Sequence, residues 1–135
     1  MKFVVYLSFD GNCREAFRFY ADVFGGTIVN MVTHGETEVR AHVPEDWHDR
    51  IINAHLVAGE AELMGADSPP GSGQPSGFSV SIQLEDAAQG ERIFNRFAEG
   101  GSVLMPFEKT FWAERFGMVT DRFDTPWMIN CGMAR

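Results

Sequence analysis

Positive charge is scarce in this chain of 135 residues. Its 11 lysine and arginine residues stand against 19 aspartate and glutamate residues, which gives a formal net charge of −8. The basic residues are scattered, so they do not form the footprint that a nucleic-acid backbone or an anionic membrane surface requires. We therefore expect neither nucleic acid nor membrane as a partner.

Long apolar runs and cysteine motifs are also missing. The sequence has no stretch of about 18 apolar residues that could span a membrane, and its start, MKFVVYLSFDGN, is too polar for a signal peptide. The two cysteines, Cys13 and Cys131, form neither a disulfide framework nor a CxxC motif. Reduced, buried thiols in a cytoplasmic protein are the simplest interpretation.

The chain does contain enough apolar residues for a folded core, and they follow a repeat. Hydrophobic residues make up 44% of it, with 12 phenylalanines. Alternating apolar residues predict strands at 3–9 and 78–84, and each is followed by a helical pattern and a glycine pair. Gly25 and Gly100, which open the two glycine pairs, lie 75 residues apart. Two similar modules are therefore expected.

Further strands complete each module. A polar loop at 33–50 and a Pro/Gly/Ser-rich linker at 67–77 separate the periodic segments, so module one is placed at 1–66 and module two at 78–135 of a single domain. The predicted class is α+β, with two tandem βαβββ modules that form an open curved sheet around a cleft and carry their helices on the convex face. Asn12 is expected to cap the first helix. The remaining expected elements are helices at 13–24 and 86–99 and strands at 27–33, 51–66 (a hairpin), 102–105, 115–120 and 127–131.

The motifs within these modules resemble those of a known superfamily. The segments FDGNCREAFRFYADVFGG, DRIINAHL, GFSVSI and TFWAERFGMVTDRFDTPWMINC are similar to the vicinal oxygen chelate superfamily of glyoxalases, bleomycin-resistance proteins and extradiol dioxygenases. They resemble most its PhnB-like branch, sometimes labelled 3-demethylubiquinone-methyltransferase-like. The resemblance covers nearly the whole chain and implies the paired-module fold and a homodimer. It leaves the reaction open, because one fold hosts many chemistries.

The resemblance also allows the metal site to be checked. Metal-dependent members take one ligand from the first strand of each module and a carboxylate from the last strand of each. Here the strand at 3–9 has no His, Asp or Glu, and the strand at 78–84 offers only Ser and Gln. Met128 stands at the last carboxylate position, so Glu62 is the only surviving ligand position. We expect no divalent metal and no other cofactor, with a non-standard ligand set as the alternative.

His55 and Glu62 are the candidate catalytic residues. A hairpin turn at 58–59 or at 59–60 places both on the same face, opposite an apolar face that packs under the helices. A His–carboxylate pair that faces a cleft can act in general acid–base catalysis. The same pair can instead be a satisfied polar contact that only shapes the cavity.

Alternation also predicts the wall of the cleft. Its side chains combine hydroxyls, amides, thioethers and aromatic rings, which suits an organic ligand with a few polar groups. Trp112 and Phe116, with Phe111, are assigned to a lip that closes over a planar ligand, with core packing as the alternative. The predicted pocket residues are Tyr6, Ser8, Met64, Ser79, Ser81, Gln83, Trp112, Phe116, Met128 and Asn130.

Two loops carry further expectations. The polar loop at 33–50 is interpreted as solvated, although its histidines and acidic residues leave a loop metal site as an alternative. Asp124 stands where members of the resembled family usually have glycine, so a positive φ there would be strained but tolerable for aspartate. The loop residues considered are His34, Glu36, Glu38, His42, His48 and Asp49.

Three functional classes follow from these patterns. The preferred one is a homodimeric, metal-independent protein that binds a small organic molecule. The first alternative is a lyase or isomerase that uses His55 and Glu62 as an acid–base pair, or that has a non-standard metal site. The second alternative is a dimeric interaction module without catalysis.

Overall fold

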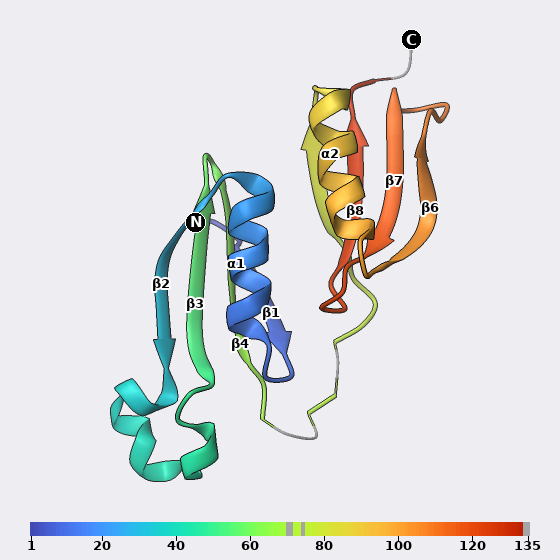
Figure 1. Ribbon diagram of the computed structural model, residues 1–135. Coiled ribbons are helices and arrows are strands. Elements are labelled where there is room, and N and C mark those ends of the chain that lie inside the picture. Colours follow the sequence, from blue (N-terminus) through green and yellow to red (C-terminus); the bar gives the residue numbers. More distant parts are fainter. Residues whose placement is uncertain (70–71, 74, 134–135) are drawn as a thin grey trace. The chain divides into compact units, whose positions relative to one another are not determined.

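The fold consists of two compact units. The computed structural model describes residues 1–69, 72–73 and 75–133, and the chain divides into the units Met1–Pro75 and Ser76–Arg135 (Figure 1). Each unit follows the order β-α-β-β-β within the described residues. The predicted α+β fold of two βαβββ modules is thereby confirmed. Their union into a single domain stays a prediction.

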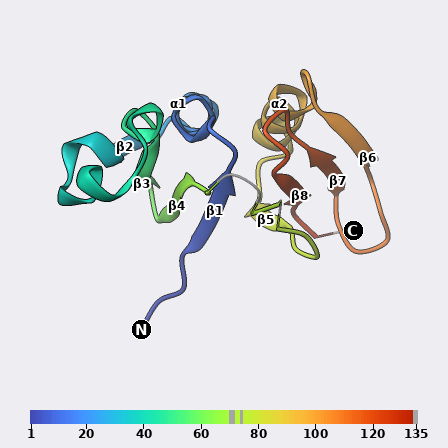
Figure 2. The same cartoon turned by 90° about the horizontal axis from the view of Figure 1, so that it is seen from below.

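The first unit has a mixed four-stranded sheet. Its strands lie in the order β1-β4-β3-β2, with β1 parallel to β4 and the other neighbours antiparallel. The helix α1 covers one face of this sheet (Figure 2). The bounds are β1 Val5–Phe9, α1 Cys13–Phe24, β2 Thr27–Thr33, β3 Ile51–Ala58 and β4 Ala61–Asp67.

The second unit repeats this topology. Its strand order is β5-β8-β7-β6, with β5 parallel to β8, and α2 again covers one face (Figure 2). Asp86 caps α2, since its side chain accepts hydrogen bonds from the backbone N–H groups of Ala88 and Gln89. The bounds are β5 Val80–Leu84, α2 Ala87–Ala98, β6 Ser102–Glu108, β7 Arg115–Thr120 and β8 Pro126–Cys131.

The two helices pack closely on their sheets because glycine lies beneath each of them. A Cβ at Gly65 of β4 would lie 2.8 Å from the ring of Phe17, and one at Gly117 of β7 would lie 2.7 Å from the ring of Phe94. Larger residues at either position would push the helix away from the sheet. Each helix thus covers one face of its own sheet, and the opposite face carries no α-helix of the same unit among the described residues.

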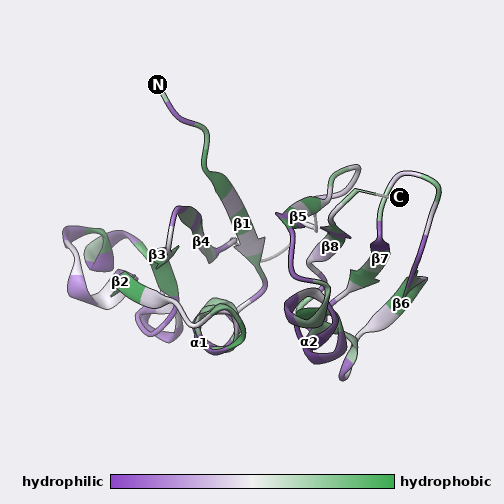
Figure 3. Cartoon of the chain, turned by 90° about the horizontal axis from the view of Figure 1, so that it is seen from above, coloured by the Kyte–Doolittle hydropathy of each residue, from purple (hydrophilic) through white to green (hydrophobic). Residues whose placement is uncertain are grey.

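The starts of β1 and β5 differ from the prediction. Both strands begin two residues later than expected, at Val5 and Val80. Phe3 is 95% exposed and Phe78 is 39% exposed, so neither contributes to the core. Figure 3 shows the green, hydrophobic stretch that leads from the N-terminus into β1. Alternation predicts which residues share a face, but it does not predict how far the helix covers that face.

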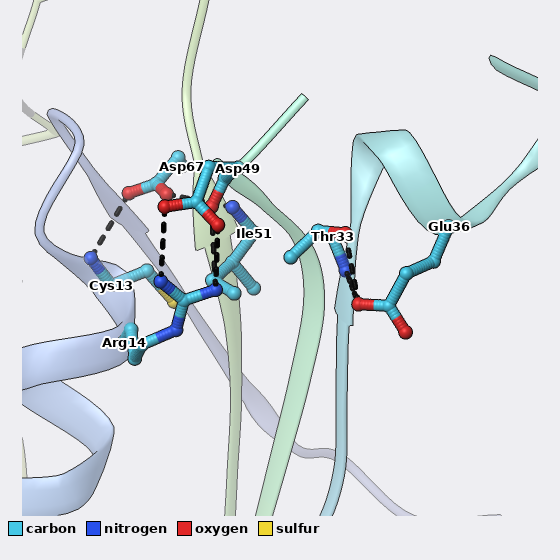
Figure 4. A network of polar contacts seen from close by, with 7 residues as sticks. All are labelled: Cys13, Arg14, Thr33, Glu36, Asp49, Ile51 and Asp67. Carbon is cyan, nitrogen blue, oxygen red and sulfur yellow. Dashed lines mark hydrogen bonds and ion pairs between the residues drawn. The ribbon is translucent and has the colours of Figure 1, made fainter. Parts of the chain in front are cut away.

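Two predictions are wrong at Asp67: the start of the linker and the cap of the first helix. It was expected at the start of the linker, but it is the last residue of β4 and is buried. Its Oδ1 accepts a hydrogen bond from the Cys13 N–H (3.0 Å) and its Oδ2 accepts one from the Ile51 N–H (2.8 Å), as Figure 4 shows. Asn12 occupies the N-cap position of α1 without a capping side-chain bond. The cap thus comes from a distant carboxylate.

The polar loop contains three short 3₁₀ helices, His34–Glu36, Glu38–His42 and Glu45–Trp47. The first is closed by a capping box, in which Glu36 accepts hydrogen bonds from Thr33. Trp47 is buried, which the sequence pattern did not predict. The loop is therefore ordered by regular 3₁₀ turns and includes the buried side chain of Trp47.

Candidate functional site

The helix-free face of the first sheet carries His55 and Glu62. The strands pair Val57 with Glu62 and His55 with Met64, which is the second of the two expected registers. His55 Nε2 and Glu62 Oε1 are 2.8 Å apart, and both side chains are partly buried. The two candidate residues thus form a direct hydrogen bond from neighbouring positions on β3 and β4.

Lys2 is the partner that sequence reasoning missed. Its ammonium group donates a hydrogen bond to Glu62 Oε2, so both carboxylate oxygens of Glu62 have partners. These two bonds, first the one from Lys2 and then the one from His55, lower the pKa of Glu62. No periodic signal marks Lys2, because it precedes β1. Both oxygens of the Glu62 carboxylate are therefore hydrogen-bonded, and its ionised form is favoured.

Glu62 is expected to make stability depend on pH. Its pKa is lowered from 4.5, so its ionised form stabilises the fold above that value, and this stabilisation is lost as the pH falls through the lower folded value. The melting temperature of Glu62→Gln should lie below that of the wild type at about pH 7, and the difference should shrink towards about pH 3. Glu60→Gln, in the exposed hairpin turn, serves as the control. An equal difference at both pH values would contradict the role given to Glu62.

A polar row extends across the same face. Tyr6 pairs with Met64, which pairs with His55, so the three residues span β1, β4 and β3. The Tyr6 hydroxyl donates to Asn53 Oδ1 over 3.4 Å, and burial raises the pKa of Tyr6. Ser8 lies opposite Ala66 at the next position. The predicted pocket residues of the first module are thus neighbours, and Asn53 is an addition.

The helix-free face of the second sheet carries a chain of four neutral side chains. Trp112 Nε1 donates to Asn130 Oδ1 (3.1 Å), and Asn130 Nδ2 donates to Gln83 Oε1 (3.1 Å). Gln83 Nε2 then donates to Ser81 Oγ (2.7 Å). The chain joins the loop before β7 to β8 and β5. The alternation of side chains along the strands placed Ser81, Gln83 and Asn130 on one face. It did not predict the hydrogen bond from Trp112.

Two aromatic residues of the predicted lip, Trp112 and Phe116, lie in contact beside these four side chains. Phe116 lies in β7 opposite Asn130, on the same face of the sheet, and is buried there. The ring of Trp112 meets Phe116 edge-on at 5.1 Å and is itself 43% exposed. Met128 pairs with both Ser81 and Met118 on the same face. Ser79 lies just outside β5.

The residues present do not fit the metal site of the metal-dependent relatives. In the part of the chain that the structure describes, no group of three or more His, Cys, Asp and Glu side chains could hold a metal ion. This result also covers the loop histidines, of which His48 contacts the Arg40 carbonyl oxygen at 2.9 Å. At the standard position Glu62 is held by Lys2 and His55, as described above, while β1 supplies only Tyr6 and Ser8 as polar side chains.

The two cysteines lie on the helix side of the sheets and are fully buried. Burial raises the pKa of the Cys13 thiol strongly, and the neighbouring Asp67 carboxylate adds to the rise. Burial also raises the pKa of Cys131. Burial thus disfavours the thiolate of both residues, which is consistent with the structural role expected for them.

Comparison with known proteins agrees with this architecture. The sequence profile of the family described as 3-demethylubiquinone-9 3-methyltransferase matches residues 1–130. The chain belongs to this family. The chain is also similar to Protein YjdN from Escherichia coli (strain K12), with 34% identity over 134 residues, which cover 93% of this chain and 91% of YjdN.

Solved structures extend the likeness. The crystal structure of protein PA1353 from Pseudomonas aeruginosa is 45% identical, covers 99% of both chains and has a TM-score of 0.90. A glyoxalase/bleomycin resistance protein/dioxygenase family enzyme from Burkholderia phytofirmans PsJN is 11% identical over 96% of this chain and 97% of its own, with a TM-score of 0.64. At that identity the likeness concerns the fold alone, the paired βαβββ modules of the glyoxalase fold. None of the described helices is both long enough and apolar enough to cross a bilayer.

Proposed function

We propose that the protein binds a small, neutral organic molecule on the helix-free face of the second unit, without a divalent metal. The observation that carries this proposal is the hydrogen-bonded chain Trp112–Asn130–Gln83–Ser81. None of its four side chains is ionisable near neutral pH. A neutral ligand is favoured because a charged one would find no counter-ion among these side chains.

The hydrogen-bonded side chains of this site retain unused donors and acceptors. Asn130 uses one of its two amide N–H groups on Gln83, and Gln83 uses one of its own on Ser81, so each amide keeps one donor. Each amide oxygen accepts a single bond within the chain and keeps one lone pair. Trp112 adds an exposed ring surface for stacking. A planar ligand with an amide or a similar donor–acceptor edge would satisfy both features.

Loss of the central amide should weaken binding. We expect Asn130→Leu to reduce affinity about tenfold or more, because it deprives both the ligand and Trp112 of a partner. Candidate ligands would come from a thermal-shift screen of neutral aromatic amides, with matched aromatic carboxylates as the charged counterparts. Isothermal titration then compares Asn130→Leu with Gln89→Leu, which removes the same amide from an exposed position on α2. Equal affinities for these two variants, or a clear preference for carboxylates, would contradict the proposal.

The hydrogen bond between His55 and Glu62 favours a second candidate function. An ionised carboxylate on an imidazole can orient it for proton transfer, as a lyase or isomerase requires. Turnover that is lost in His55→Gln but kept in Asn130→Leu would support this function over simple binding. Stoichiometric metal bound through Glu62 in protein purified without chelator would overturn metal independence.

We further propose a cytoplasmic homodimer. The proposal rests on reduced, buried cysteines and on the dimer that the family resemblance implies. Light scattering at several concentrations tests it. A dimer in which ligand binding and turnover are both absent would favour the interaction module instead.

Methyl transfer, which the family's description names, is not proposed, because the β1–α1 turn Asp10-Gly11-Asn12 carries one glycine and lacks a glycine-rich cofactor loop.

A further inference from the structure

Unsatisfied polar atoms gather in the loop of the first unit. Among the described residues, the buried side-chain atoms without a hydrogen-bond partner are Nδ1 and Nε2 of His34 and Nη1 of Arg50. Buried polar groups are nearly always hydrogen-bonded, to protein, water or an ion. His34 and Arg50 are thus two neighbouring residues with polar side-chain atoms that no described protein group satisfies.

His34 and Arg50 belong to one cluster. The His34 N–H donates to the Arg50 carbonyl oxygen over 3.0 Å, where the ends of β2 and β3 meet. Both side chains contact buried Trp47. The His34 ring meets the indole edge-on at 5.4 Å, and the Arg50 guanidinium carbon lies 4.6 Å from the ring centroid. Trp47 therefore holds the two nitrogen-bearing side chains in place.

The β1–α1 turn completes the cluster. A Cβ at Gly11, whose φ is +88°, would lie 2.8 Å from Arg50 Nη1, so the guanidinium rests against this glycine. Asp10 Oδ1 lies 3.9 Å from the same nitrogen, which is too far for a hydrogen bond, and its side chain is 80% exposed. Asp10 is therefore a weakly held counter-ion of Arg50, because it is exposed and makes no hydrogen bond to the guanidinium.

Other acidic side chains near the cluster are already engaged. Asp49 forms an ion pair with Arg14 at 3.4 Å, and Glu36 accepts hydrogen bonds from the backbone and hydroxyl of Thr33 (Figure 4). Asp10 forms the ion pair with Arg50, so it is the carboxylate with which a bound anion would compete.

We propose that His34 and Arg50 form a binding site for a small oxyanion, a carboxylate or phosphate group, in the first unit. Guanidinium nitrogens can only donate, and an imidazole offers at least one N–H, so an acceptor oxygen suits Arg50 Nη1 and the protonated ring nitrogen of His34. A carboxylate or phosphate presents several acceptor oxygens and a negative charge that matches Arg50. The site lies in the 33–50 loop and shares no residue with the neutral chain of the second unit, so the two proposals can fail separately.

The test measures anion binding at His34. Two-bond ¹H–¹⁵N correlation spectra report the ring nitrogens of the 4 histidines, and His34→Gln assigns the His34 signals. Sodium phosphate and sodium acetate are titrated separately at constant ionic strength, which shows whether phosphate or carboxylate is preferred. We expect saturable shifts of the His34 ring nitrogens and a loss of affinity of about tenfold or more in Arg50→Met.

Asp10→Asn provides the decisive comparison. Removing the competing carboxylate should tighten binding about two- to fivefold, whereas Asp49→Asn removes the same charge from the same region without exposing Arg50. A gain in affinity cannot come from misfolding, so this outcome stands even if Arg50→Met is unstable. Three results would overturn the proposal: equal effects of Asp10→Asn and Asp49→Asn, undiminished binding in folded Arg50→Met, or unresponsive His34 nitrogens, which would mean that water alone fills the site.

Discussion

Replacing Asp67 with alanine is expected to lower the free energy of unfolding by about 3–5 kcal/mol. The substitution leaves the Cys13 and Ile51 N–H groups buried without an acceptor, and it removes the cap of α1 at the same time. Asp67→Asn should lose less, because the amide keeps one accepting oxygen while its NH₂ group faces a donor. The carboxylate connects β4, α1 and β3, so its loss loosens three elements at once.

Urea unfolding followed by circular dichroism measures this effect. Asp46→Asn, in an exposed position of the polar loop, is the matched control and should change stability by less than about 0.5 kcal/mol. A loss below about 1 kcal/mol for Asp67→Ala would mean that water replaces the carboxylate, and it would contradict the capping role.

In the second unit, replacing Asp121 with alanine is expected to lower the free energy of unfolding by about 3–4 kcal/mol. Its Oδ1 accepts hydrogen bonds from the N–H groups of Phe123 (2.8 Å) and Thr125 (3.1 Å), and its Oδ2 accepts one from Trp127 Nε1 (2.8 Å). The side chain is buried, so these three donors would lose their acceptor where water cannot easily replace it.

The neighbouring aspartate supplies the control for this experiment. Asp124 has a φ of 68°, so Asp124→Gly should be neutral or slightly stabilising. Trp127→Phe isolates the indole bond and should cost part of the Asp121→Ala effect. Urea unfolding gives the energies, and near-ultraviolet circular dichroism reports the packing of Trp127 against Phe97, whose rings stack at 4.5 Å. If Asp121→Ala and Asp124→Gly were equally stable, the turn would not depend on the carboxylate.

Much of the fold could be predicted because it rests on local periodicity. The strand β2 was predicted at its observed bounds, and the αL conformation of Gly25 ends α1 where the glycine pair indicated. The buried residues Trp127, Ile129 and Cys131 alternate along β8 as expected. These features repeat every two or 3.6 residues, so a single sequence reveals them.

The candidate site could be predicted only in part. Parity placed His55 and Glu62 on one face, and their hydrogen bond follows from the register of a tight hairpin. Lys2 on Glu62 and Trp112 on Asn130 were missed, because both come from irregular segments beside the strands. Side chains that reach in from such segments leave no period to detect.

By itself, the sequence determined that this protein has two βαβββ modules, and it gave the alternation of buried residues along β8. Only the tertiary structure decided that Asp67 caps a helix 54 residues away, that Lys2 holds Glu62, and that His34 and Arg50 meet at Trp47. The physical reason is the difference in range. Periodicity follows from the geometry of one helix or strand, whereas a hydrogen bond between distant residues exists only once the chain has folded around it.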